Sequence, residues 1–205
     1  MDIQTSRLLG ILGAIFMVLI IIPQIGVLLM LLGIIFLLIA LKGYADTYKE
    51  SAIFENALYT IVFEIIGAVV FIAILLFVAL GFLSTLGITN ITDFASWQAV
   101  DWQQAVNIDN ILPFIAQIVI ALVVLFAFTI FAALYFRKSM NALSTKTGVH
   151  LFHTTGTVFF VGAFLTIILI GFLIIWVSFV LLVISFYESK PVNQTQQPQQ
   201  QNPPS

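Results

Sequence analysis

The sequence contains no cysteine and few charged residues, and each shortage excludes classes of protein. Without cysteine the 205-residue chain has no disulfide, zinc ribbon, iron–sulfur cluster or thiol nucleophile. Charged residues make up 8% of the chain, against about 25% in soluble domains. Seven basic and nine acidic residues give a net charge of −2, which offers nucleic acid no electrostatic footprint, so we expect no nucleic-acid partner.

Apolar residues, by contrast, make up 61% of the chain, and the mean hydropathy is +1.16. An apolar run of about 18 residues or more indicates a helix that spans a membrane, because a helix satisfies its own backbone in lipid. We predict an all-α, polytopic transmembrane helix bundle over residues 1–190, with the lipid bilayer as its partner. The Gln/Pro-rich residues 191–205 are too polar to pack and predict a disordered tail.

Six apolar segments are predicted to span the membrane. They cover residues 8–22, 25–41, 57–83, 111–136, 154–170 and 172–187. Pro23 and Gln24 separate the first two, which as one helix would be about 50 Å long, too long for a single crossing. The last apolar block, residues 154–187, is also about 50 Å long as one helix. We divide it at Gly171 into two spans, with a single fifth span as the alternative.

The division of the last block rests on an internal similarity. The stretch GAIFMVLI at Gly13 resembles GAFLTIIL at Gly162, and the stretch that begins at Ile25 resembles the one that begins at Ile170. Pseudo-repeats of this kind are common in membrane proteins. The sequence therefore predicts two similar helical hairpins, the second of which turns at Gly171.

Local patterns predict where two of the helices begin. Thr47-Tyr-Lys-Glu50 has the spacing of a capping box and predicts a helix that starts there and continues into the third span. Pro113 falls in the first turn of the fourth span, where the missing N–H of proline is harmless.

The longest polar stretch, residues 84–110, contains Trp97 and Trp102 but no Lys or Arg. Tryptophan is typical of a membrane–water boundary. The spacing of Phe94, Trp97 and Val100 favours one face of a short interfacial helix.

Basic residues predict the orientation. With six spans, the basic residues before Lys190 all fall on one side of the membrane and loop 84–110 falls on the other; they are Arg7, Lys42, Lys49, Arg137, Lys138 and Lys146. Under the positive-inside rule the N-terminus is cytoplasmic and the loop is external, in the cell membrane. Six spans also place Lys190 inside, whereas five place it outside.

Glu64 is the ionisable residue within the third predicted span. A charge at a helix centre costs about 2.5–3.5 kcal/mol on insertion scales, and such residues often mark ion or proton pathways. If the third and fourth spans are antiparallel, counting residues along each places Glu64 near the level of Thr129, which could donate a hydrogen bond to it. These two residues are the candidate intramembrane polar site, and a purely structural carboxyl at the cytoplasmic margin is the alternative.

Other polar residues are interpreted as structural. His150 and His153 are one helical turn apart, but two imidazoles without further ligands do not make a metal site, so we expect no bound metal. Gln117, Thr166 and Ser178 are predicted to donate hydrogen bonds between helices.

Several short motifs resemble one known family. They are Leu-Gly-x-x-Gly at residues 9–13, Ile-Pro-x-Ile-Gly at 22–26, Ile-Ala-Leu-Lys-Gly-Tyr-Ala-Asp-x-Tyr at 39–48 and Ser-Ala-Ile-Phe-x-Asn-Ala-Leu at 51–58. The chain resembles the archaeal multi-pass membrane family of unknown function numbered 996, over nearly its whole length up to about Tyr187. The resemblance implies a membrane location and an archaeal source, and it brings no known activity. A cysteine-rich zinc ribbon ends some members of that family, and this chain lacks it.

Two functions from different classes remain. The chain contains no Walker, GxSxG, HExxH or Rossmann motif, so we expect neither enzymatic activity nor a cofactor. The first hypothesis is a non-enzymatic membrane protein that acts by helix packing and association, as a homo-oligomer or with other membrane proteins. The second is a small ion or proton transporter or channel that uses Glu64.

Overall fold

The computed structural model describes residues 2–88, 90–102 and 107–189. Over these residues the chain is helical, with no strand, and six helices are long and apolar enough to cross a membrane. The predicted polytopic helix bundle is therefore confirmed. Lys190 and the predicted disordered tail, residues 191–205, lie outside the described residues.

Three antiparallel helical hairpins make up the bundle. The first consists of α1 (Ile3–Val18), the 3₁₀ turn η1 (Leu19–Ile21) and α2 (Gly26–Tyr48). The second pairs the two longest helices, α3 (Ser51–Thr85) and α6 (Ile108–Thr147), with the short α4 (Phe94–Gln98) between them. The third consists of α7 (His150–Leu165), η2 (Thr166–Ile168) and α8 (Ile170–Glu188).

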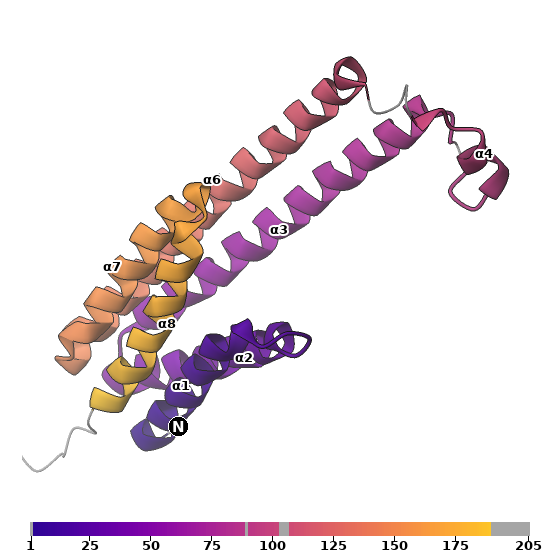
Figure 1. The fold of residues 1–205 in the computed structure, drawn as a ribbon. Coiled ribbons are helices and arrows are strands. Elements are labelled where there is room, and N and C mark those ends of the chain that lie inside the picture. The colour runs from indigo at the N-terminus through magenta and orange to yellow at the C-terminus, as the bar shows by residue number, and fades with distance from the viewer. Residues whose placement is uncertain (1, 89, 103–106, 190–205) are drawn as a thin grey trace, which may run out of the picture.

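The two ends of the bundle differ. The N-terminus, the α2–α3 and α6–α7 junctions and the end of α8 lie together at one end, which we call the basal end (Figure 1). At the other, distal end, α3 and α6 extend side by side well past the two short hairpins toward α4 (Figure 1). All six long helices contribute to the buried core, but α3 contributes only Ile53 and Ala57, from its first two turns.

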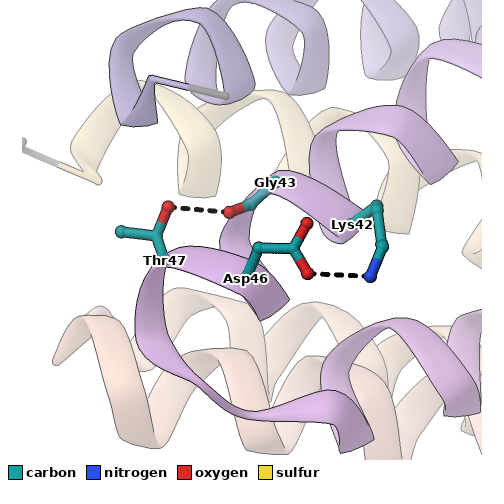
Figure 2. Close-up of polar contacts among 4 residues, drawn as sticks. All are labelled: Lys42, Gly43, Asp46 and Thr47. Carbon is teal, nitrogen blue, oxygen red and sulfur yellow. Dashed lines mark hydrogen bonds and ion pairs between the residues drawn. The ribbon is translucent and has the colours of Figure 1, made fainter.

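The predicted helix start at Thr47 is wrong. Thr47 lies in the last turn of α2, where its hydroxyl donates to the carbonyl oxygen of Gly43 at 2.8 Å (Figure 2). Lys49 has a left-handed backbone, φ 52°, which ends α2, and α3 begins at Ser51. The hydroxyl expected to cap a new helix is thus bound to the carbonyl of the preceding one.

The two short hairpins are built alike, as the internal similarity predicts. Each begins with a 16-residue helix followed by a three-residue 3₁₀ turn. The second hairpin turns at Leu169, φ 65°, and not at Gly171. Gly171 lies in the first turn of α8, where a Cβ would meet the backbone of Gly162 and Thr166, so the glycine serves close packing instead of the turn.

At the distal end, α4 begins at Phe94, and the carboxylate of Asp93 accepts the N–H of Ala95 at 3.1 Å. Val100 lies beyond the end of α4, so the predicted three-residue face is limited to Phe94 and Trp97. The helix α6 starts three residues before the predicted span, which places Pro113 in its second turn instead of its first. Helices continue into the polar flanks because backbone hydrogen bonding does not stop where hydrophobicity does.

Candidate functional site

Glu64 lies on α3, two turns beyond Ala57 on the same face, and is half-buried. The neighbouring Phe63 ring contacts Phe128 and Phe131 of α6, with centroids 6.4 and 5.7 Å apart. These contacts place Glu64 and Thr129 at a similar depth along the paired helices α3 and α6. In the described part of the chain no hydrogen bond joins them, and no ion pair involves Glu64.

Aromatic residues close to Glu64 in the sequence pack against α6. The ring of Tyr135 lies 5.3 Å from that of Phe63 and 5.2 Å from that of Tyr59. Lys138 follows on α6, with its ammonium 4.8 Å from the centroid of the Tyr135 ring. A half-buried carboxyl on such a helix can exchange a proton or bind a small cation.

A second group of polar residues, the basal polar cluster, consists of Arg7, Tyr44 and Ser189. The guanidinium of Arg7 donates to the carbonyl oxygen of Phe186 at 3.1 Å and to that of Tyr187. The hydroxyl groups of Tyr44 and Ser189 lie 2.6 Å apart and are buried. The cluster ties α1 and α2 to the end of α8, and a cation satisfies the carbonyls that a helix leaves without partners at its C-terminus.

Further polar contacts join the other helices near the same end. The Ser139 hydroxyl of α6 donates to the carbonyl oxygen of Ile53 in α3 at 2.6 Å. Thr155 of α7 and Ser185 of α8 form a buried hydroxyl pair at 3.1 Å. These bonds use polar side chains to hold helices together, which is their usual role in a membrane bundle.

The last two turns of α2 begin residues 42–58, the segment that resembles the family most distinctively. Lys42 forms an ion pair with Asp46 one turn later, 2.7 Å between Nζ and Oδ1, and both side chains are about half exposed (Figure 2). The Lys42 ammonium also lies 5.5 Å from the Phe54 ring of α3. Charged residues thus line the exposed side of this segment, while Tyr44 points into the bundle.

The remaining candidates do not form a site. His150 and His153 are both exposed at the start of α7, and among the described residues no three His, Asp or Glu side chains gather as a metal site. Thr166 and Ser178 donate to the carbonyl oxygens of Ala163 and Ile175, three residues earlier in the chain, so the predicted bonds to neighbouring helices are wrong. Gln117 is half-buried and makes no hydrogen bond within the described part of the chain.

The basal polar cluster was not predicted from the sequence. Arg7 is separated from its acceptors by 179 and 180 residues, and Tyr44 from Ser189 by 145. No local spacing encodes such pairs. The available signals are the position of Arg7 before the first apolar run and of Tyr44 at the end of the second.

The fold defines a multi-pass helical membrane protein, and comparison with known proteins places it more closely. The family described as "Protein of unknown function (DUF996)" matches residues 29–180, and the chain belongs to this family. An uncharacterized protein from the archaeon Methanocaldococcus jannaschii is 22% identical over 189 residues, which cover 91% of this chain and 93% of the relative. No solved structure matches the chain. The predicted family resemblance is confirmed.

Proposed function

We propose that this protein is non-enzymatic and acts by association in the archaeal cell membrane, with a second copy of itself or with other membrane proteins. The observation that carries the proposal is the uncovered distal part of α3. Only four of its 35 residues are buried. Ile72, Leu76 and Leu80 lie one turn apart on one exposed face, with Leu76 60% exposed. Such a face is available to a helix of another molecule.

The contacts at the basal end are consistent with this proposal. Its polar side chains are used within the chain, in bonds such as those of Arg7, Ser139 and Thr155. Because lipid tails are as apolar as leucine, helices in a membrane associate through packing and polar bonds and not through hydrophobicity alone. We therefore assign folding to the basal contacts and association to the distal faces.

Association is tested by counting fluorophore bleaching steps for the protein at low density in liposomes. We expect more than one copy per complex. Leu76→Trp should reduce that number, because a bulky side chain is tolerated against lipid but overpacks a helix interface. Ile35→Trp, on the exposed side of α2, is the matched control and should leave it unchanged. Single copies of the parent protein at every density would contradict self-association.

We also propose that the basal end faces the cytoplasm. Lys42, Lys49 and Lys146 lie at the basal end, whereas Trp97 and Trp102 follow the distal end of α3. This asymmetry is what the positive-inside rule requires. Cysteines placed at Thr145 and Ala99 in the cysteine-free chain should be labelled from opposite sides by an impermeant maleimide, with Ala99 outside. Labelling of Thr145→Cys from outside would contradict the orientation.

A second candidate function, conduction of a proton or small cation, is favoured by one observation. Glu64 is half-buried on α3 without an ion pair among the described residues, at the depth of Thr129. An intramembrane carboxyl is a typical part of such pathways, although a solute pathway usually has several polar groups. Flux through proteoliposomes, compared with empty liposomes, tests this candidate directly.

A further inference from the structure

The tips of the two short hairpins, residues 19–28 and 166–173, are apolar and exposed. Ile21, Val27, Ile167 and Leu169 are 67%, 69%, 74% and 74% exposed. Apart from Gln24 and Thr166, every side chain of the two tips is apolar or glycine. A turn that ends in water normally carries polar residues such as Asn, Asp and Ser.

The turn that joins α3 to α6 has the opposite character. Asn90 accepts hydrogen bonds from Thr92 through its side chain, and Asp93 does so from Ala95. Ser96 donates to the carbonyl oxygen of Asp93 at 2.7 Å. The same chain thus makes one turn with polar side chains and two turns without them. This difference in composition indicates that the turns lie in different surroundings.

Contacts between helices give the depth of the second tip. The Phe164 ring of α7 lies 6.5 Å from that of Phe126 in α6, and the adjacent Leu125 lies beside Gly67 of α3. From this level α7 and η2 continue for only about 7 Å, whereas α3 continues for about 27 Å to Thr85. The tip therefore falls about 20 Å short of the distal end of α3.

The first tip lies at the same depth, because α1 and α8 are antiparallel neighbours. Phe186 packs against Gly10, and the indole N–H of Trp176 donates to the carbonyl oxygen of Val18 at 2.9 Å. The apolar arm of α1 and η1, residues 8–21, is about 21 Å long, against about 30 Å for the hydrocarbon core. The apolar part of α3, residues 57–83, is about 40 Å long and crosses that core even when tilted.

The tips also satisfy much of their own backbone, as a segment in hydrocarbon must. Val18 ends α1, and its carbonyl accepts the Trp176 indole, although tryptophan at an interface usually turns its N–H toward water. The N–H of Gly26 donates to Ile22 at 2.8 Å, and the N–H of Leu169 donates to Thr166 at 3.0 Å. Pro23, at the first turn, has no N–H to satisfy.

We propose that both tips end inside the bilayer, among lipid acyl chains, and that only α3 and α6 cross it completely. The α1–α2 and α7–α8 hairpins enter from the basal side and return to it. The start of α1 and the end of α8 then lie on the same side, as they do with six complete crossings. The occupant of the tip surface is lipid, and neither water nor a protein partner covers it.

The test uses nitroxide labels at single cysteines in the cysteine-free chain, reconstituted in liposomes. The tip variants are Ile21→Cys and Leu169→Cys, one for each hairpin. Ala99→Cys, exposed beyond the end of α4, is the aqueous control, and Ile35→Cys, exposed midway along α2, is the lipid control. Collisions of each label with oxygen and with a water-soluble nickel complex are measured.

We expect both tip labels to behave as the lipid control does. Collisions with the nickel complex should be at least about tenfold rarer than at Ala99→Cys, because hydrocarbon excludes a polar solute, while oxygen collisions stay frequent. Nickel collisions as frequent as at Ala99→Cys would place the tips in water and overturn the proposal. Rare collisions with both reagents would mean that protein covers the tips, which also overturns it.

Discussion

The basal and distal parts of α3 and α6 differ both in composition and in what surrounds them. The basal parts carry polar residues such as Glu55, Asn56 and Arg137, whereas residues 68–83 of α3 are all apolar or glycine. Near the basal end other helices pack against them, and polar bonds such as Ser139 to Ile53 cross between helices. Near the distal end the two helices pack on each other through rings such as Phe82 and Phe114. The comparison shows that polar bonds and close packing accompany the less apolar, covered parts of these helices, while the most apolar part of α3 is left uncovered.

The largest expected effect comes from adding a methyl group where backbones are close. A Cβ on Gly13 would lie 2.8 Å from the carbonyl oxygen of Gly33 and 2.8 Å from the backbone nitrogen of Leu37. Gly13→Ala must push α1 and α2 apart, so we expect the free energy of unfolding in bicelles to fall by about 1–3 kcal/mol.

The matched control is the same change at the distal end. At Gly81 the nearest atom to an added Cβ is the Phe114 ring, 3.7 Å away. Gly81→Ala should therefore be neutral or stabilise the helix by up to about 1 kcal/mol. Equal losses at the two positions would mean that the α1–α2 contact and the distal α3–α6 contact are equally tightly packed.

A smaller loss is expected when one hydrogen bond of the basal polar cluster is removed. Tyr44→Phe deletes the hydroxyl that lies 2.6 Å from Ser189 but keeps the buried ring. A net hydrogen bond is worth about 1 kcal/mol, and the unfolding free energy should fall by that amount. Tyr187→Phe, at a side chain 68% exposed, is the control and should show no loss. An unchanged Tyr44→Phe protein would remove this bond from the account of the basal end.

Glu64→Gln separates the two candidate functions. It keeps the size of the side chain and removes a charge that is costly in low dielectric, so stability in detergent should hold or rise. We expect no proton or cation flux above that of empty liposomes for either protein. Flux in the parent that disappears in Glu64→Gln would establish conduction through this carboxyl, and flux that survives would assign conduction to other groups.

The smallest effect is expected at an exposed ion pair. Lys146, in the last turn of α6, forms an ion pair at 2.9 Å with Glu50, the residue that precedes α3, and about a third of each side chain is exposed. Lys146→Met should cost less than about 1 kcal/mol and less still at high salt. A loss larger than that of Tyr44→Phe would show that surface charge, and not the buried bonds, stabilises the basal end.

The sequence predicted the helical segments well, because long apolar runs and their polar breaks depend only on local composition. The depth of Glu64 relative to Thr129 also followed from simple antiparallel counting, and the aromatic contacts of Phe63 agree with it. Helix ends were less predictable. The capping-box pattern at Thr47 failed because the hydroxyl bonds to the carbonyl of Gly43 within α2.

Interactions between distant residues were beyond local patterns. Trp176 bonds to Val18, 158 residues away, and Arg7 bonds to the end of α8. Leu169 adopts the left-handed conformation that glycine usually takes, while Gly171 makes a close backbone contact with Gly162. Such choices depend on how the helices pack and not on residue type alone.

The most direct test of association at the distal faces is a pulsed dipolar distance measurement between copies, with one nitroxide at Leu76→Cys and the protein dilute in liposomes. We expect a narrow distance distribution between copies for this label and a broader, longer one for Ile35→Cys on α2. Only the background expected for randomly placed molecules at Leu76→Cys would contradict self-association through the distal faces of α3 and α6.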